Sequence, residues 1–306
     1  DILRLSKRRW RCCAGAKILR HLPRDSFWIF LNAIMDRIYW STGQFVLGMF
    51  KGAAVVAVYA VAIQLQAIYM GFSTAISGVF LPKVTAMVTK ENNEKAISDL
   101  FIRTGRIQYI IIAFILTGFV VFGKSFIRLW AGSDYEDAYG ITLCFFIPMT
   151  VPLIQNLGII ILQARNQMKF RSTLYVVIAF VSLVISIPLS KQYGGIGCAI
   201  SIALALTTGQ IIVMNIYYHR VIHIDILDFW KEIGKMSLVP FAIGSLSFYL
   251  FCIYEIHTVQ IFIVCIFAFL CIYVPLFWFF GMNAYEKELF VSPVRRFVGR
   301  LQKNLQ

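Results

Sequence analysis

Long apolar runs separated by short polar segments dominate the sequence. Each run covers about twenty residues, the length that an α-helix needs to cross the ~30 Å hydrocarbon core of a bilayer. The ten-residue alternation of apolar and polar positions expected of a membrane β-barrel does not occur. The pattern therefore predicts an all-α, polytopic membrane protein. The eight predicted spans are 26–50, 54–82, 105–123, 138–163, 172–190, 196–218, 236–255 and 258–280.

The distribution of Lys and Arg supports these spans. The segments 1–25, 83–106, 164–171, 219–235 and 281–306 contain 24 of the 29 basic residues, whereas the alternate loops contain four. Cytoplasmic loops carry such an excess of basic residues. We therefore predict that both ends of the chain are cytoplasmic.

The same boundaries divide the chain into five parts. Two cytoplasmic segments, 90–106 and 219–235, have apolar residues at helical spacing, which predicts interfacial helices on the inner leaflet or surfaces for a partner. The parts are a basic segment 1–25, a six-helix lobe 26–218, an amphipathic linker 219–235, a two-helix hairpin 236–280 and a basic tail 281–306.

Composition excludes several other classes. Hydrophobic residues make up 59% of the chain and charged residues only 14%, against about 25% charged in soluble domains. The net charge of +14 is explained by the cytoplasmic loops rather than by nucleic-acid binding. The seven cysteines and four histidines show no metal-ligand spacing, and no phosphate-binding loop or nucleophile motif occurs. We expect no cofactor, no metal and no enzymatic activity.

The first span carries the strongest candidate site. Asp36 and Arg37 lie near its middle, where each charge costs about 2.5–3.5 kcal/mol on an insertion scale. At 100° per residue, Asn32, Trp40 and Gln44 share half of the helix circumference with them. Charged residues on such a face indicate a functional site, with a structural charge pair as the alternative.

Two further spans contain polar residues at depth. The second span contains Tyr59 and Gln64, and Gln64 is expected to be the deeper of its two amides, bonded to a neighbouring helix or facing water. In the span 138–163, Pro148 and Pro152 predict a kink just before Asn156. Interrupted helices of this kind often line transporter sites, although a kink can also serve packing alone.

Four stretches resemble the Wzx-type oligosaccharide flippases of the multidrug/oligosaccharidyl-lipid/polysaccharide exporter superfamily. The matching stretches keep the family's order and spacing and cover about 45–200. They are 47–59 followed by Leu81-Pro82, then 122–139, 162–170 with Arg165 at its centre, and 193–199 with its Gly194-Gly195-Ile196-Gly197 turn.

The resemblance implies the second lobe of a two-lobe, MATE-like transporter plus two additional helices, so we expect the chain to be the C-terminal part of a longer protein. The implied substrate is an undecaprenyl-pyrophosphate-linked oligosaccharide, flipped across the bacterial inner membrane by alternating access. Arg37 would attract the anionic substrate and Asp36 would bind H⁺ or Na⁺ or orient Arg37. Tyr59, Gln64, Asn156 and Arg165 complete the expected transport site. Membrane lipids and a glycan polymerase or assembly machinery are the further expected partners.

Other classes remain as alternatives. A drug or cation exporter of the same superfamily and a MurJ-type lipid II flippase share the expected fold. A membrane glycan polymerase or ligase shares the hydropathy, but it usually carries a large outward loop, and the outward loops here are short. A purely structural bundle is disfavoured by the charged face of the first span.

Overall fold

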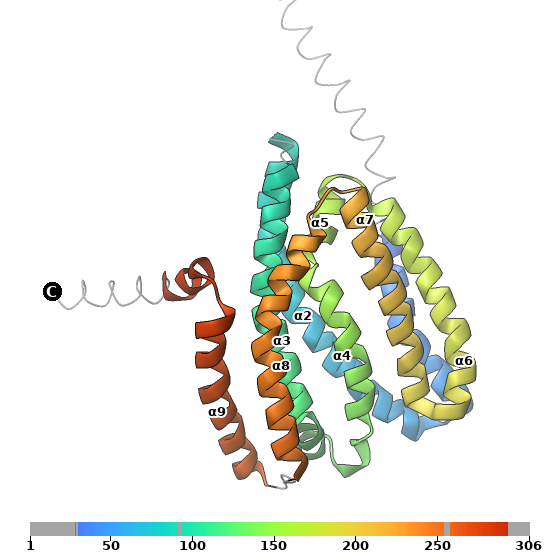
Figure 1. Cartoon of the computed structure of the whole chain (residues 1–306). Helices are drawn as coiled ribbons and strands as arrows, with labels where there is room; N and C mark the ends of the chain where they lie inside the picture. The colour runs from blue at the N-terminus through green and yellow to red at the C-terminus, as the bar shows by residue number, and fades with distance from the viewer. Residues whose placement is uncertain (1–27, 29, 91–93, 254–257, 293–306) are drawn as a thin grey trace, which may run out of the picture.

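The computed structural model describes residues 28, 30–90, 94–253 and 258–292, and within them every regular element is a helix (Figure 1). The chain is an all-α polytopic membrane protein, which confirms the predicted fold class. The basic segment 1–25 and residues 293–306 of the predicted tail lie outside the described residues.

The helices follow one another with short connections. A helix at 30–50 comes first and a helix at 284–292 comes last, and neither is labelled in Figure 1. The elements between them are α2 (Ala53–Lys90), α3 (Glu94–Trp130), the 3₁₀ turn η1 (Ser133–Tyr135), α4 (Ala138–Ile154), α5 (Leu157–Ala164), α6 (Met168–Leu206), the π-helix η2 (Thr207–Val213), α7 (Met214–Arg220), α8 (Ile226–Ile253), α9 (Val259–Leu276) and the π-helix η3 (Phe277–Gly281).

By length and apolar composition, four of the described helices can cross a membrane, and the bent pair α4–α5 makes a fifth if it is counted as one span. One of the four, Met168–Arg220, contains two predicted spans, 172–190 and 196–218, because the chain reverses between them. The helix at 30–50 and α8 are not among the four. The spans predicted at 26–50 and 236–255 are helical over their described residues, and their crossing of the bilayer stays a prediction.

The reversal occurs at Gly194, whose backbone angles are φ 61° and ψ −135°. Residues with a Cβ rarely adopt this conformation, so a glycine is needed at this turn. Past it, α6 returns and continues through η2 and α7, as Figure 1 shows. Gly209 of the returning arm lies directly against Ile178 of the first arm. The predicted glycine turn is therefore confirmed as the corner of a helical hairpin.

The two prolines of the fourth predicted span mark a break in its helix. Pro148 and Pro152 lie inside α4, which ends at Ile154, and α5 starts at Leu157 after a bend of 47°. Proline frees the carbonyl one turn earlier and weakens the helix at that point. The kink predicted from the two prolines is confirmed, and it places Gln155 and Asn156 at the corner between the two helices.

The two segments predicted as interfacial helices are instead parts of longer helices that pack on each other. Residues 94–106 form the first turns of α3, and 226–235 form the first turns of α8. The rings of Phe101 and Phe229 lie 5.1 Å apart between centroids, and both side chains are buried. A Cβ at Gly105 would overlap the Phe229 ring, so the glycine permits this contact. The apolar faces of the two segments are thus complementary to each other, and their position at the inner leaflet stays a prediction.

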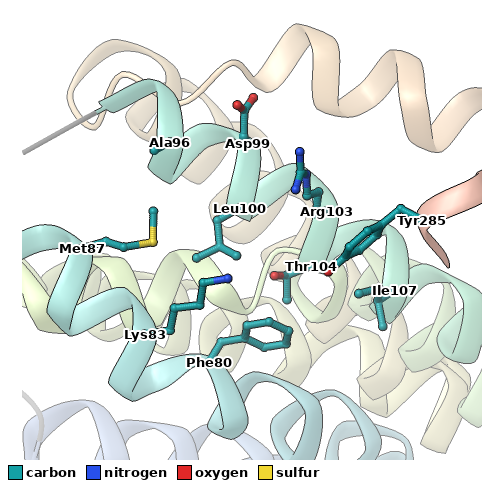
Figure 2. Close-up of a pocket in the computed structure, with 10 residues that line it drawn as sticks. All are labelled: Phe80, Lys83, Met87, Ala96, Asp99, Leu100, Arg103, Thr104, Ile107 and Tyr285. Atoms are coloured by element: carbon teal, nitrogen blue, oxygen red, sulfur yellow. The ribbon is translucent and has the colours of Figure 1, made fainter. Parts of the chain in front are cut away.

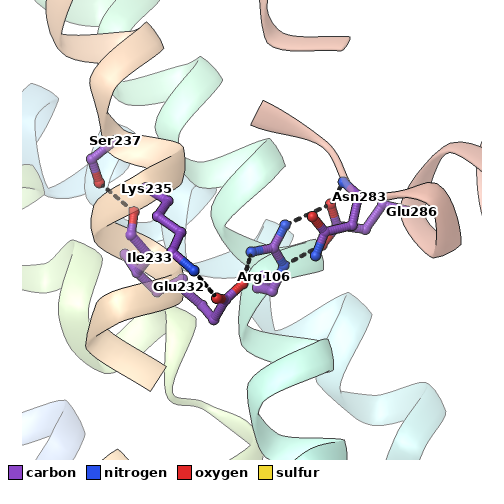
Figure 3. A network of polar contacts seen from close by, with 7 residues as sticks. All are labelled: Arg106, Glu232, Ile233, Lys235, Ser237, Asn283 and Glu286. Carbon is purple, nitrogen blue, oxygen red and sulfur yellow. Dashed lines mark hydrogen bonds and ion pairs between the residues drawn. The ribbon is translucent and has the colours of Figure 1, made fainter. Parts of the chain in front are cut away.

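A buried ionic network ties α3 to the last elements of the chain (Figure 3). The Arg106 guanidinium donates two hydrogen bonds to Glu286, from Nε at 2.6 Å and from Nη2 at 3.1 Å, and a third from Nη1 to Glu232 at 2.6 Å. Only 5% of the Arg106 side chain and 3% of the Glu286 side chain are exposed. Lys235 donates a hydrogen bond to Glu232, and this bond, together with the charge of Arg106, holds the pKa of Glu232 below its usual range. The network anchors α8 and the helix at 284–292 to α3.

Candidate transport cavity

A polar cavity of about 320 Å³ lies between the helix at 30–50, α2, the α4–α5 corner and the hairpin formed by α6 and η2. Exposed residues at its rim, Ala33 and Thr74, show that it opens to the surface. Its lining consists of Asn32, Ala33, Asp36, Trp40, Met70, Thr74, Met149, Pro152, Leu153, Asn156, Ile159, Gln163, Met168, Arg171, Tyr175, Leu206 and Gln210.

Packing of aromatic rings holds the helix at 30–50 in place beside this cavity. Phe145 of α4 makes edge contacts with Trp40 at 5.6 Å and with Tyr59 at 5.7 Å between ring centroids. The Tyr39 hydroxyl donates a hydrogen bond to the Ile202 carbonyl at 3.0 Å. Tyr39 and Trp40 are anchored in this way, and Asp36 lies one helical turn before Trp40. The carboxylate of Asp36 is therefore presented to the cavity.

The charged centre of the cavity is formed by Asp36 and Arg171. The half-buried carboxylate of Asp36 interacts electrostatically with the guanidinium groups of Arg171 and Arg37 and with the side chains of Trp40 and Tyr175. Arg171 is 6% exposed, and its guanidinium lies 5.3 Å from the centroid of the Tyr175 ring. Inside the cavity one carboxylate thus faces one guanidinium, and Arg37 adds a second positive charge from outside the cavity.

Several buried polar atoms along the lining have no hydrogen-bond partner among the described residues. They are Oδ1 of Asn32, Nε of Arg171 and Nε2 of Gln210. An unsatisfied buried polar group costs roughly 1–3 kcal/mol, and a charged group costs more. Three such atoms around one cavity therefore indicate a site that water or a polar ligand fills.

The α4–α5 corner contributes the remaining amides. Asn156 donates a hydrogen bond from Nδ2 to Ser73 Oγ at 3.3 Å, and the Ser73 hydroxyl donates to the Leu153 carbonyl at 2.7 Å. That carbonyl belongs to the last turn of α4, next to the break. Gln163, near the end of α5, also lines the cavity. The proline kink therefore turns the amide side chains of Asn156 and Gln163 toward the cavity.

Four of the nine residues proposed from the sequence line this cavity, namely Asn32, Asp36, Trp40 and Asn156.

The other five proposed residues do not line the cavity; they are Arg37, Gln44, Tyr59, Gln64 and Arg165. Arg37 is exposed and points outside the cavity, within electrostatic reach of Asp36, and Gln44 is half-buried and lines none of the described pockets. Tyr59 is fully buried in the packing core beside Phe145. Arg165 donates a hydrogen bond to the Ile222 carbonyl at 3.3 Å in the connection after α5.

The relative depth expected of the two amides of α2 was wrong. Gln64 is exposed, whereas Gln66 is 2% exposed and donates a hydrogen bond to the Met149 sulfur at 3.5 Å. The two positions are two residues apart and so point in nearly opposite directions on a helix. Gln64 therefore faces outward from the bundle, and Gln66 bonds the neighbouring helix α4.

Gln163, Arg171, Tyr175 and Gln210 are polar lining residues that the sequence analysis did not propose. Arg171 was assigned to a cytoplasmic loop, but α6 already begins at Met168 and carries it into the bundle. One signal was available, because Arg171 and Tyr175 are four residues apart and thus share a helix face.

The fold and this cavity define a helical membrane protein with a charged, partly unsatisfied polar site that opens to the surface. Residues 2–140, a little under half of the chain, match the model of a family described as polysaccharide biosynthesis protein. This match is consistent with a role in polysaccharide biosynthesis. Neither a curated protein nor a solved structure matches the chain.

Proposed function

We propose that the chain forms part of a flippase that moves undecaprenyl-pyrophosphate-linked oligosaccharides across the bacterial inner membrane by ion-coupled alternating access. The observation that carries the proposal is the buried guanidinium of Arg171, with its unpaired Nε, beside Asp36 in a cavity that opens to the surface. A pyrophosphate binds guanidinium groups through charge-assisted hydrogen bonds. The family match over residues 2–140 is consistent with a role in polysaccharide biosynthesis, the process to which such a substrate belongs.

The remaining lining fits the sugar part of such a substrate. Asn32, Asn156, Gln163 and Gln210 supply amide donors and acceptors, the groups that hydrogen-bond sugar hydroxyls. Trp40 supplies an aromatic surface at the same cavity. Apolar walls with a few placed polar groups are typical of small-molecule sites.

Asp36 has the second role in the proposal. Its carboxylate is compensated by Arg171 and Arg37 when the cavity is empty. A pyrophosphate bound in the cavity competes for the Arg171 guanidinium, so the carboxylate then gains affinity for H⁺ or Na⁺. Substrate and coupling ion are thereby linked through one charge cluster. In the proposed transporter the exposed Arg37 faces the cavity between the two lobes, and the chain forms the second of these lobes.

The net charge argues against a drug or cation exporter. A cationic substrate would find no excess negative charge in the cavity, because the Asp36 carboxylate is balanced there by the Arg171 guanidinium. Such a substrate gains from a site with excess negative charge. We therefore place the anionic, lipid-linked substrate first.

The test compares surface glycan in a deletion strain that is complemented with variants at equal membrane protein level. Arg171→Gln should abolish surface glycan. Arg171→Lys should keep part of it, because Lys retains the positive charge but lacks the planar guanidinium that donates two parallel hydrogen bonds. Asp36→Asn should abolish it as well. Lys169→Gln, an exposed position on the same helix, serves as the matched control. Normal glycan from both Arg171→Gln and Asp36→Asn would refute the proposed site.

A further inference from the structure

A second polar pocket, of about 230 Å³, lies between α2, α3 and the helix at 284–292 (Figure 2). We call it the α2–α3 pocket, and its main lining residues are Phe80, Lys83, Arg103, Thr104, Ile107 and Tyr285. We propose that the α2–α3 pocket binds the phosphate group of an anionic phospholipid from the cytoplasmic leaflet.

The position of the pocket matches the boundary of the membrane. The sequence places Phe80 and Ile107 inside predicted spans, and it places Lys83 and Arg103 in the cytoplasmic segment 83–106. Phe80 and Ile107 thus line the pocket on the predicted membrane side, and Lys83 and Arg103 line it at the level predicted for lipid headgroups. Basic pockets between helices on the cytoplasmic side are typical headgroup sites.

The polar groups of the pocket suit a phosphate. Thr104 is 1% exposed, and its hydroxyl has no hydrogen-bond partner in the described part of the chain. Figure 2 shows the Thr104 hydroxyl and the Lys83 ammonium directed toward one another across the pocket. A phosphate oxygen between them would accept a hydrogen bond from each group. The ligand would satisfy a donor that the protein leaves unpaired.

The second cation is held at the edge of the pocket. The Arg103 guanidinium lies 5.5 Å from the centroid of the Tyr285 ring, so the ring orients it without neutralising its charge. Neither Lys83 nor Arg103 forms an ion pair with a described residue. One acid, the exposed Asp99, also lines the pocket, which leaves a net charge of about +1.

The surroundings favour a lipid over a free phosphate ion. Val79 is 76% exposed on α2 immediately beside Phe80, so apolar surface continues outward from the pocket toward the bilayer. An acyl chain can cover this surface, whereas an inorganic ion leaves it bare. A choline headgroup would bring a fixed positive charge toward Lys83 and Arg103, so an anionic headgroup should be preferred.

The experiment measures lipid binding to the purified chain in detergent by native mass spectrometry, with phosphatidylglycerol, phosphatidylcholine and inorganic phosphate as three separate probes. Phosphatidylglycerol should bind most tightly. The double variant Lys83→Gln/Arg103→Gln should bind it roughly 30-fold more weakly, since each basic residue near an anionic headgroup contributes a factor of about five. Lys169→Gln is the matched control and should leave binding unchanged.

Variants of Thr104 separate binding from folding. Thr104→Val should weaken phosphatidylglycerol binding about 2- to 10-fold through the loss of one hydrogen bond, while Thr104→Ser should retain it. Without lipid, Thr104→Val should unfold at the same or a higher temperature than the wild type, because it removes a buried hydroxyl that forms no hydrogen bond with a described residue. Equal binding of phosphatidylcholine and phosphatidylglycerol would overturn the proposal. The proposal would also be overturned if Lys169→Gln lost as much phosphatidylglycerol binding as the double variant. Displacement of the lipid by inorganic phosphate at equal concentration would overturn it too.

Discussion

The Arg106–Glu286 pair allows a quantitative test of how the last helices are attached to the rest of the bundle. Both side chains are at least 95% buried, and the two hydrogen bonds between them form a bidentate contact. Arg106→Met would leave the Glu286 carboxylate buried, with the Asn283 backbone N–H as its one remaining donor among the described residues. Removing one partner of a buried ion pair costs about 3–5 kcal/mol.

The double variant gives the discriminating result. Arg106→Met/Glu286→Met removes both buried charges, and replacing a complete buried pair with apolar residues is often neutral or stabilising. Glu232 does not become an orphan in this variant, because it keeps its hydrogen bond with Lys235 at 2.7 Å. The double variant should therefore lose much less stability than the two single variants combined.

The assay is thermal unfolding in detergent, followed by tryptophan fluorescence. Arg106→Met should lower the midpoint by roughly 6–20 °C, taking about 2–4 °C per kcal/mol for a chain near this size. Glu286→Met should lower it by less, because Arg106 keeps its ion pair with Glu232 at 2.6 Å. Asp228→Asn removes the exposed pair with Lys231 on α8, where the side chains are 63% and 70% exposed, and it should produce no measurable shift. An Arg106→Met midpoint equal to that of Asp228→Asn would refute the reasoning. A double variant whose midpoint falls by the sum of the two single-variant shifts would refute it as well.

Two further predictions concern the helical hairpin and the topology. Gly194→Ala should reduce folded protein in the membrane, because alanine is strained at φ 61° and ψ −135°, whereas Gly234→Ala, in open space on α8, should be neutral or slightly stabilising. Folded yield by size-exclusion chromatography checks both, and equal yields would contradict the turn requirement. Single cysteines at Ser133 and Lys231, in a background without native cysteines, should be labelled from opposite sides by an impermeant reagent. Labelling of both from the outside would contradict the predicted orientation.

The elements that follow from local chemistry were predictable from the sequence. The spans follow from the length of apolar runs, the hairpin corner from Gly194, and the break after α4 from Pro148 and Pro152. The cavity-facing side of the first span, with Asn32 and Asp36, follows from helical periodicity alone.

Features that depend on tertiary packing were not predictable in the same way. Which of Gln64 and Gln66 faces inward depends on where α4 packs against α2. Arg171 looked like a loop residue because the start of α6 is set by the bundle rather than by hydropathy. Arg106 and Glu286 are 180 positions apart, so no local pattern connects them.

The most direct test of the proposed function is the sidedness of the lipid-linked oligosaccharide in cells that lack the gene. Membrane vesicles of defined orientation, from the deletion strain and from the complemented strain, would be treated with an impermeant glycosidase that cleaves the oligosaccharide. We predict that the intermediate is still made in the deletion strain and accumulates on the cytoplasmic face, with normal distribution restored by the wild-type gene and not by Arg171→Gln. A deletion strain that makes no lipid-linked oligosaccharide would contradict the account, because the protein would then act in synthesis rather than in transport. An intermediate that still reaches the outer face would contradict it as well.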